Sequence, residues 1–485
     1  MRKRFEQQLS IGRLLIEDTQ IPTAKRSGAL PGLCAALKEI YTNTEYNEKI
    51  FSVLERKILS KNNETGRPGL GLWQIFVLSQ VRLCQNISYD ELHHIANYDS
   101  LMRQIIDIET VHGYDKQEIG YQRIIDNVGL LDDETVKEIN DIIIEFGHGV
   151  FKKKEAAALR LKTDSFVVES NVHFPTDYNL LWDSARKSID MINKLQEKHS
   201  LPGWRKVDNW RNDLKNKMRA LGRASASGGK RKQERLASAT KKYLAKAKAL
   251  YNKIEKSKSA YPREDAADIV IIMELERFIQ LLHKHIDLLE RRVIKGEEIP
   301  HSEKMFSIFE QYTEWVTKGK MRPSVELGKK TAITTDQFNL IVDYQVMENQ
   351  ADSKIVSELS KRIFASFSVT SWSFDKGYWH RDNKTLLSKN VETLVLPKKG
   401  KCNKAEAGEE HRPIFKKLRH KHSAVESNIN ELEHRGLDRC PDKGYNNFKR
   451  YVGLSVCAYN LRKIGEHLIH IKRQKEAPSK QKRAA

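Results

Sequence analysis

Three acidic residues have the type and the position expected of metal ligands: Asp164, Asp375 and Glu426. Carboxylate oxygens are hard ligands of the kind that Mg²⁺ and Mn²⁺ prefer. Two such ions about 3.5–4 Å apart can activate an attacking hydroxyl group and stabilise a leaving oxygen in phosphoryl transfer. The three residues therefore predict metal-dependent phosphoryl-transfer chemistry, provided that the fold brings them together.

Asp164 lies in a predicted strand, within the stretch 160–177 that reads R-L-K-T-D-S-F-V-V-E-S-N-V-H-F-P-T-D. Alternation places it on the same face as Phe166 and Val168, where a carboxylate is costly unless something uses it. Metal coordination is one such use. A buried salt bridge or a turn-facing edge is the commoner one, because most polar residues in strands are structurally satisfied.

Asp375 follows a predicted strand at 364–374, and Gly377 allows a sharp turn beside it. Ligand sites in open sheets gather at the carboxyl ends of strands, which favours a site here. Asp375 could instead be a simple turn residue. Its D-K-G-Y sequence recurs at 442–445, after Pro441 and before a predicted helix, where we interpret it as structural helix-entry chemistry.

Glu426 lies in the first turn of a predicted helix at 423–435. Ser423 is the expected N-cap of this helix. The structural alternative for Glu426 is therefore the second member of a capping box with Ser423.

The elements that must position these residues form several regions. Residues 1–150 are predicted to be helical, with helices at 30–41, 45–60, 72–85, 99–106 and 133–146. Ser88 and Glu91 predict a capping box at the start of a further helix. Two short helices around a basic break resemble a helix-turn-helix module for DNA, but a plain helical bundle fits the pattern at least as well.

Residues 171–174 are predicted to form a short strand and residues 178–198 a helix. The segment 201–260 then holds 18 Lys and Arg against 4 Asp and Glu, which is two-thirds of the net charge. Helices are predicted at 230–256 and 265–294, as an antiparallel hairpin. A solvated basic helix is one interpretation of this segment, and a phosphate-binding arm is the one that the charge favours.

An α/β pattern returns at 300–400, with strands from 325, at 340–347 and at 391–396, and helices at 352–362 and 383–389. Residues 401–422 are predicted to be basic and irregular. A last helix is expected at 448–468, and the basic tail is predicted to be disordered.

The totals restrict the class of protein. The chain has 485 residues, a net charge of +21 and a pI of about 9.5, which favours a polyanionic partner. No apolar run is long enough for a membrane span, and the N-terminus lacks the apolar core of a secretory signal. The five cysteines form no C-x-x-C pair, which argues against a zinc ribbon and fits reduced thiols in a cytosol.

Five stretches carry a resemblance to a known family: T-D-S-F-V-V-E-S-N-V-H-F-P-T-D (163–177), F-S-I-F-E-Q-Y-T-E-W-V-T-K-G-K (306–320), V-E-L-G-K-K (325–330), D-K-G-Y-W (375–379) and H-S-A-V-E-S-N-I-N-E-L-E-H-R-G-L (422–437). The chain resembles DDE transposases of bacterial insertion sequences, most of all the ISNCY type. G-R-P-G-L-G-L-W-Q-I-F-V-L and I-S-Y-D-E-L also resemble the helical DNA-binding domain of such enzymes.

The resemblance implies an α/β RNase H-like catalytic domain, a mixed sheet with flanking helices, together with an all-helical N-terminal domain and a helical insertion. The expected division is a helical DNA-binding domain at 1–150, the catalytic domain at 151–200 and 301–470, the basic insertion at 201–300 and a disordered tail at 471–485.

The resemblance also implies that Asp164, Asp375 and Glu426 are the catalytic metal ligands, for Mg²⁺ or Mn²⁺ and two ions. Many related enzymes carry an Arg four residues before the Glu and a Lys seven after it. Here these positions hold His422 and Glu433. The expected DNA contacts are therefore a wider set: Lys376, Arg419, His422 and Arg435.

The implied function is binding of the ends of an insertion sequence, followed by metal-dependent strand cleavage and strand transfer. The expected partners are double-stranded DNA, as element ends and target, and a second copy of the chain. The expected place is the bacterial cytoplasm, at the nucleoid. The alternatives are a DNA-binding protein that has lost catalysis and a structure-specific nuclease of the same fold. A basic membrane-surface protein is a more distant one, because the basic helices lack a free apolar face.

Overall fold

The computed structural model describes residues 14–24, 28–59, 69–108, 118–151, 158–263, 265–317 and 324–481. The chain forms two compact units, Met1–Asn171 with Val316–Ala485 and Val172–Trp315. The first unit is thus built from two separate lengths of chain, and the second is inserted after the first strand. The N-terminal stretch considered for a secretory signal lies outside the described residues.

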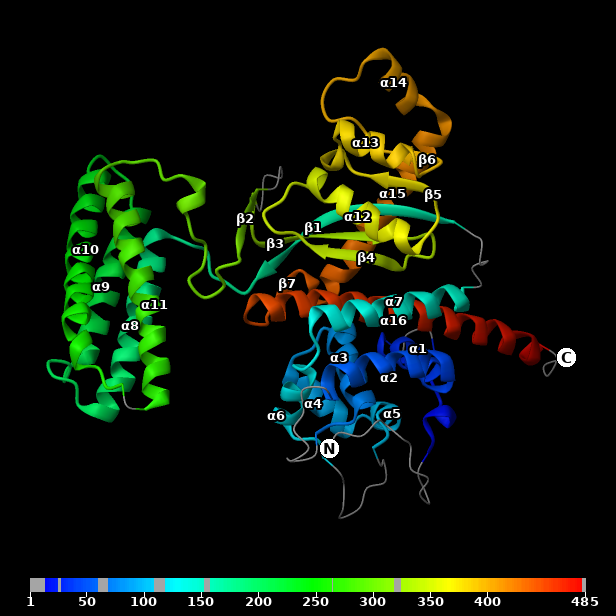
Figure 1. Ribbon diagram of the computed structural model, residues 1–485, viewed down its shortest axis with the longest axis horizontal. Helices are drawn as coiled ribbons and strands as arrows, with labels where there is room; N and C mark the ends of the chain where they lie inside the picture. The colour runs from blue at the N-terminus through cyan, green and yellow to red at the C-terminus, as the bar shows by residue number, and fades with distance from the viewer. Residues whose placement is uncertain are drawn as a thin grey trace. The chain divides into compact units, whose positions relative to one another are not determined.

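The first unit contains a mixed sheet (Figure 1). Strand β1 lies between β3, to which it is antiparallel, and β5, to which it is parallel. β4 pairs antiparallel with β3, β6 pairs parallel with β5, β2 pairs with β3, and β7 pairs with β1. This arrangement is compatible with the expected RNase H-like domain. The strands are β1 Leu159–Ser170, β2 Glu314–Thr317, β3 Val325–Thr335, β4 Ile341–Val346, β5 Val369–Phe374, β6 Thr393–Val395 and β7 Arg439–Cys440.

Helices follow the later strands of this sheet: α12 Asp352–Ser366, α13 Arg381–Ser388, α14 Lys404–His411 and α15 Pro413–Leu432. α12 continues to Ser366, so β5 begins at Val369 rather than at 364 as predicted. The predicted strand at 171–174 is wrong, because these residues form no strand pairing and lead directly into a helix. The predicted irregular segment at 401–422 is also wrong, since α14 and the first half of α15 occupy most of it.

The N-terminal helices pack on the other side of two long helices, α7 and α16, which lie between them and the sheet (Figure 1). α16 contacts α1, α3 and α7 as well as β4. The capping box predicted for α4 is confirmed, because the Ser88 hydroxyl accepts from the Glu91 amide and the Glu91 carboxylate accepts from the Ser88 amide. The helices are α1 Leu30–Thr42, α2 Thr44–Ile58, α3 Leu72–Gln85, α4 Tyr89–Tyr98, α5 Ser100–Ile105, α6 Tyr121–Val128, α7 Asp133–Val150 and α16 Tyr445–Gln481.

A buried asparagine fixes α16 against the edge of the sheet. The Asn460 side chain accepts from the Ile341 amide of β4 at 2.8 Å and donates to the Ile341 carbonyl at 3.0 Å. It also donates to Asn140 of α7 at 2.9 Å. α16 continues to Gln481, into the segment predicted as a disordered tail, and residues 482–485 lie outside the described residues.

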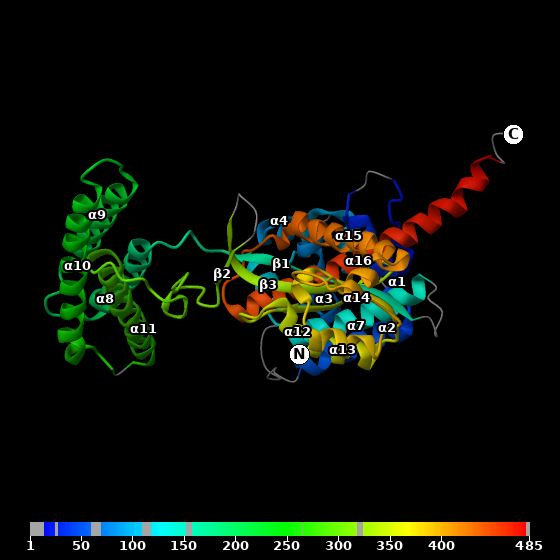
Figure 2. The same cartoon turned by 90° about the horizontal axis from the view of Figure 1, so that it is seen from above.

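The second unit is a four-helix bundle, and Figures 1 and 2 both show its helices alongside one another. α8 contacts α9 and α11, and α10 contacts the same two helices. The sequence-based limits of 201 and 300 leave α8 in the catalytic domain, whereas the structure packs it within this bundle. α9 is absent from the prediction because its polar composition conceals its apolar stripe. The helices are α8 Asp177–His199, α9 Val207–Ala226, α10 Lys232–Ser257 and α11 Ala266–Leu289.

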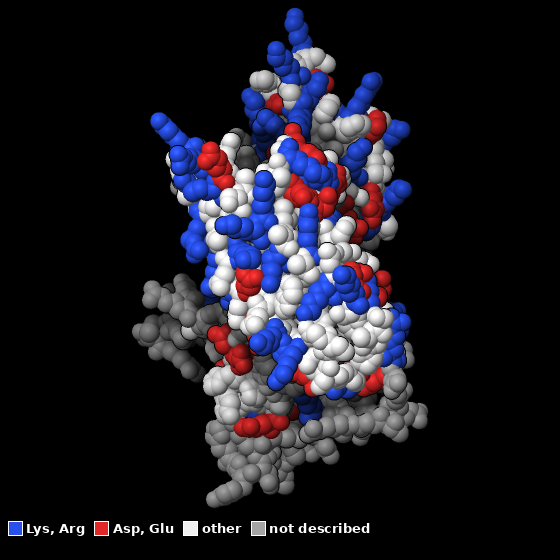
Figure 3. Space-filling view, turned by 90° about the vertical axis from the view of Figure 1, so that its left-hand side faces the viewer, with Lys and Arg blue, Asp and Glu red and all other residues white. Residues whose placement is uncertain are grey.

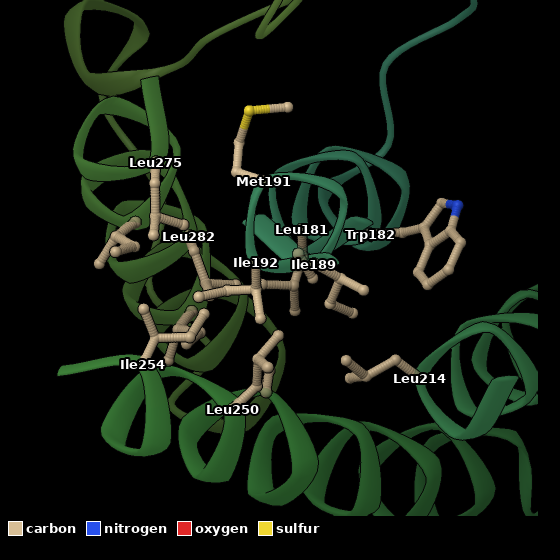
Figure 4. Close-up of a cluster of buried hydrophobic side chains, with 14 of the residues drawn as sticks. Leu181, Trp182, Ile189, Met191, Ile192, Leu214, Leu250, Ile254, Leu275 and Leu282 are labelled. Carbon is tan, nitrogen blue, oxygen red and sulfur yellow. The ribbon is translucent and has the colours of Figure 1, made fainter. Parts of the chain in front are cut away.

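The bundle encloses its own core of aliphatic side chains (Figure 4). Leu181 and Ile192 of α8, Leu250 of α10 and Leu282 of α11 are fully buried there. Burial of several such side chains in one cluster is the main source of stability for a bundle of this kind.

None of the five cysteines, all of which lie in the described residues, forms a disulfide bond, and only Cys402 is exposed. No helix in the described part of the chain is long and apolar enough to cross a membrane.

Candidate active site

Two of the predicted carboxylates come from neighbouring parallel strands. The register of β1 and β5 ends with Thr163 opposite Phe374, so Asp164 and Asp375 are the next residues on the two strands. The Trp372 indole donates to the Thr163 hydroxyl at 2.8 Å, and that hydroxyl lies 2.8 Å from Thr334 Oγ1 of β3. These buried hydrogen bonds tie together the three strands beneath the two aspartates.

Glu426 comes from α15, which packs against β1, β5 and β6. Its apolar stripe follows helical spacing at Phe415, Leu418, Val425 and Ile429. Glu426 lies near the middle of this helix and is exposed. The capping-box alternative is wrong, because α15 begins at Pro413 and the hydroxyl of Ser423 donates to the carbonyl of His420 at 2.8 Å. Pro413 at the first helical position was the signal for the earlier start.

The negative charges of Asp375 and Glu426 both act on the Asp164 carboxyl group. Burial raises the pKa of the Asp164 carboxyl group to about 6, and the negative charges of Asp375, Glu426 and Asp352 add to the rise. A hydrogen bond from the Ser165 amide at 2.7 Å acts in the opposite direction. The fold therefore brings the three sequence-predicted carboxylates into one electrostatic neighbourhood, from two strand ends and a helix.

The carboxylates share this neighbourhood without forming a closed ligand set. Among the described residues, no group of three or more acidic, histidine or cysteine side chains is arranged to hold a metal ion. Asp164 is partly buried, whereas the Asp375 and Glu426 side chains are exposed. Three carboxylates are nonetheless the donor chemistry that Mg²⁺ and Mn²⁺ prefer. A bound cation would relieve the repulsion between Asp164 and the neighbouring carboxylates.

A fourth carboxylate, Asp352 at the start of α12, is a site residue that the sequence reasoning missed. One of its oxygens accepts from the Ser165 hydroxyl at 2.8 Å, and the other lies 2.6 Å from Lys330 Nζ. A Cβ at Gly377 would lie only 2.9 Å from the second oxygen. Asp352 therefore joins β3, β1 and the turn after Asp375, and Gly377 is required by close approach.

Lys330 gives the V-E-L-G-K-K motif a role, because it is the cation that pairs with Asp352. Gly328 of the same motif lies against the β1 backbone, where an added Cβ would be 1.9 Å from the Val168 carbonyl oxygen. The sequence showed these residues only as part of a resemblance. Their partners lie more than 20 residues away, so local pattern could not reveal them.

His422 faces the sheet from α15, one turn before Glu426. Its Nδ1 lies 3.0 Å from Ser373 Oγ of β5. Burial lowers the pKa of His422 to about 4, against the opposing charge of Asp375. The imidazole is therefore neutral at neutral pH, so it can hydrogen-bond but cannot supply the positive charge expected of a phosphate contact.

The other three predicted DNA contacts have different surroundings. Lys376 is exposed beside Asp375, and Arg419 is exposed on α15 with Glu410 Oε2 at 3.9 Å. Arg435 lies beyond the end of α15 and donates to the Cys84 carbonyl of α3 at 2.9 Å. Lys376 and Arg419 are thus available to a polyanion, whereas Arg435 attaches the end of α15 to the N-terminal helices.

A small basic cavity was also missed by the sequence reasoning. It has a volume of ≈140 Å³ and is lined by Arg160 and Lys162 of β1, Ser373 of β5 and Lys421 of α15. Burial lowers the pKa of the Lys162 ammonium group, the charge of Asp336 opposes this shift, and the charges of Arg160 and Lys421 add to it. These three cations, of which Lys162 lies two residues from Asp164, form a local positive field that suits phosphate.

The second D-K-G-Y sequence is structural, as interpreted from the sequence. Asp442 forms an ion pair with Arg82 of α3 at 2.9 Å and lies 3.5 Å from Arg450 of α16. Gly444 has a φ of +86°, and α16 begins at the next residue.

Residues 298–461 match the family model described as Transposase DDE domain. The matched segment includes Asp375 and Glu426 and covers about a third of the chain, while Asp164 precedes it. Comparison with curated proteins and with solved structures gave no match.

Proposed function

We propose that this chain is a DDE transposase of an insertion sequence, in line with the match of residues 298–461 to the Transposase DDE domain. In this proposal Asp164, Asp375 and Glu426 form the catalytic site for cutting the ends of an element and joining them to target DNA. The observation that carries this assignment is the field at Asp164, where the charges of Asp375 and Glu426 both act. The purely structural roles considered for the three residues, a helix cap or an ion pair, have little support. Glu426 is not a capping residue, and no ion pair to Asp164 or Asp375 occurs among the described residues.

We propose divalent metal, Mg²⁺ or Mn²⁺, as the cofactor, with two ions held by the three carboxylates. When bound, such ions activate the attacking hydroxyl group and stabilise the leaving oxygen. The exposed side chains of Asp375 and Glu426 have to turn toward Asp164 to complete the ligand set. The backbone positions of Asp164 and Asp375 are fixed, because the two residues follow the paired ends of the adjacent strands β1 and β5.

Asp352 and Lys330 act as positioning residues in this proposal. Lys330 neutralises Asp352 at 2.6 Å, so Asp352 can hold Ser165 and the Gly377 turn without adding its full charge to the site. The Asp375 backbone is thereby kept beside Asp164. His422, as a neutral group on Ser373, fixes the distance between α15 and β5.

We propose that DNA phosphates near the carboxylates are held by Lys376 and Arg419, together with Lys162 and Lys421 of the basic cavity. Lys376 and Arg419 are exposed and Lys421 lies on the same helix as Glu426. His422 and Arg435 are weaker candidates, because one is neutral and the other donates to a backbone carbonyl. The ISNCY type, the recognition of element ends and a homodimer that joins two ends remain predictions.

The test is DNA cleavage by the full chain with Mg²⁺ and a duplex that carries an end of the element. Asp375→Asn and Glu426→Gln should each lower the cleavage rate by about a thousandfold, because losing a ligand removes several kcal/mol of charge stabilisation. Asp382→Asn is the matched control, since Asp382 is an exposed acid in the same segment whose only ion-pair partner in the described structure is His380.

Full cleavage by Asp375→Asn or Glu426→Gln would disprove the assignment. Duplex binding without any Mg²⁺-dependent product would favour a DNA-binding protein without catalysis. Cleavage of branched DNA without joining would favour a structure-specific nuclease. A strand-transfer assay on pre-cut ends separates the last outcome from transposition.

A further inference from the structure

The segment 201–260, which contains α9 and α10, carries more positive charge than its own acids can neutralise. Segment 201–260 has 18 Lys and Arg against 4 Asp and Glu. Asp213 takes two of the cations, Lys217 and Lys246, both at 2.9 Å. Glu290 of the neighbouring segment takes Lys248 at 2.8 Å. Most of the remaining cations form no ion pair among the described residues.

These cations border a groove between the two helices, with a volume of ≈630 Å³. Lys217 of α9 lies on one side. Arg231, the N-cap residue of α10, lies on the other side with Arg235 and Lys242 of that helix. The groove is lined between them by small side chains, such as Ala220 and Ala239, and by one acid, Glu234. Figure 3 looks onto this side of the unit and shows Lys and Arg outnumbering acids over much of it.

The positions of the cations are unfavourable for the helix alone. α10 begins at Lys232, so Lys230, Arg231 and Lys232 surround a helix N-terminus, where the helix dipole is already positive. Arg231 and Arg235 are also four residues apart, a spacing at which like charges repel. Arg235 is held in place by hydrogen bonds to the Gly228 carbonyl at 2.5 Å and to Ser227 Oγ at 3.4 Å. An anion in the groove would satisfy the dipole and the side chains together.

The chemistry of the surface favours nucleic acid over a membrane. A membrane-bound basic helix also needs exposed Trp, Phe or Leu side chains. Among the described residues of α9 and α10, none is a large exposed hydrophobic residue. The groove instead combines flexible Lys and Arg side chains with a shallow surface of small residues, which suits a phosphate backbone.

We infer that the groove between α9 and α10 binds the backbone of duplex DNA without regard to sequence, as a DNA contact distinct from the carboxylate site. The inference rests on the proposed function for the identity of the polyanion as DNA. It assigns the inserted helical unit a role in holding DNA rather than in the chemistry.

The test measures the affinity of the full chain for a labelled duplex of scrambled sequence, in EDTA, between about 50 and 200 mM salt. The test variant combines Arg231→Glu, Arg235→Glu and Lys242→Glu. The control variant combines Lys194→Glu, Arg277→Glu and Lys295→Glu, three exposed cations of the same unit outside the groove. Both variants change the net charge equally.

The groove variant should bind at least about tenfold more weakly, and its plot of log affinity against log salt should be shallower by about two to three, as expected for three lost phosphate contacts. The control should stay within about twofold of the parent chain and keep its slope. Circular dichroism and thermal unfolding identify any variant that fails to fold, in which case the single substitution Lys242→Glu replaces the triple.

Equal losses in both variants would overturn the inference, because the affinity would then report overall charge. Unchanged binding by the groove variant would also overturn it. So would groove-dependent binding to anionic phospholipid vesicles with unaltered DNA affinity. Failure of the catalytic proposal would appear as cleavage by Asp375→Asn, and failure of the groove would appear as unchanged DNA affinity of the groove variant in EDTA, so the two failures remain distinguishable.

Discussion

The two D-K-G-Y sequences share four residues and have opposite surroundings. Asp375 is exposed, and its negative charge raises the pKa of Asp164. Asp442 is largely buried, between Arg82 and Arg450. The first copy ends a parallel strand, and the second precedes a helix of 37 residues. The difference shows that the chemistry of an aspartate follows from the charges that the fold places around it.

The glycines of the two copies differ in the same way. Gly377 has an ordinary φ, and an added Cβ there would meet the Asp352 carboxylate. Gly444 has a φ of +86° and open space around it. Gly377 is needed because the Asp352 carboxylate lies close to it, and Gly444 is needed because of its positive φ. The same four-residue motif therefore requires glycine for two different reasons.

The largest effect on stability should come from Asp442. Asp442→Ala leaves Arg82, whose side chain is only 7% exposed, without its partner, and removing one member of a buried pair costs about 3–5 kcal/mol. Asp375→Ala should change the free energy of unfolding by no more than about 0.5 kcal/mol, because it removes an exposed acid that no described cation pairs with. Urea unfolding of both variants measures the contrast, and equal losses would remove the distinction between the copies.

A smaller effect, of opposite sign, is expected at Asp164. Its pKa in the folded chain, about 6, lies above its ordinary value of 3.8. The contribution of Asp164 to the free energy of unfolding of the metal-free protein is therefore most favourable at low pH. It is lost as the pH rises through about 6.

Asp164→Asn removes that dependence and should stabilise the metal-free protein by between about 1 and 3 kcal/mol at neutral pH. Unfolding in EDTA across the pH range tests this, with Asp382→Asn as the exposed control. A loss of stability at neutral pH would show that Asp164 has a structural partner.

The smallest effects should separate the glycines. Gly444→Ala places a Cβ at positive φ and should cost about 1 kcal/mol without lowering the cleavage rate. Gly377→Ala should change stability by less than about 1 kcal/mol and lower cleavage severalfold, because the Asp352 carboxylate must move away from Lys330 or Ser165. Melting temperature and cleavage rate should be measured for both variants. A loss of cleavage in Gly444→Ala together with a loss of stability alone in Gly377→Ala would refute this prediction.

Local signals in the sequence predicted some of this fold correctly and misjudged one helix. The capping box of Ser88 and Glu91 is present, whereas the same pattern at Ser423 and Glu426 lies inside α15. The difference is the preceding segment. Residues 413–422 carry the stripe of Phe415 and Leu418, which many Lys, Arg and His residues conceal.

The positions of the three carboxylates along the chain were predictable, because strand ends and helix patterns are local. Their support was not, since Lys330 and Asp352 meet only through the register of β3 and the start of α12. The neutral state of His422 was equally hidden, because it results from burial against a sheet assembled from distant strands. The sequence thus predicts the three acids as a site but does not indicate the residues that surround them.

The contact of α16 with α1 and α3 has a consequence for how the chain is made. Translation at about 5–20 residues per second separates the emergence of Leu30 from that of Tyr445 by about 20–80 s. Throughout this interval the N-terminal helices lack the helix against which they pack, whereas the inserted bundle has every buried residue of its own core once Leu289 has been synthesised. A ribosome that stops between Leu289 and Tyr445 therefore releases a chain with a complete bundle core and with N-terminal helices that lack α16 as a packing partner.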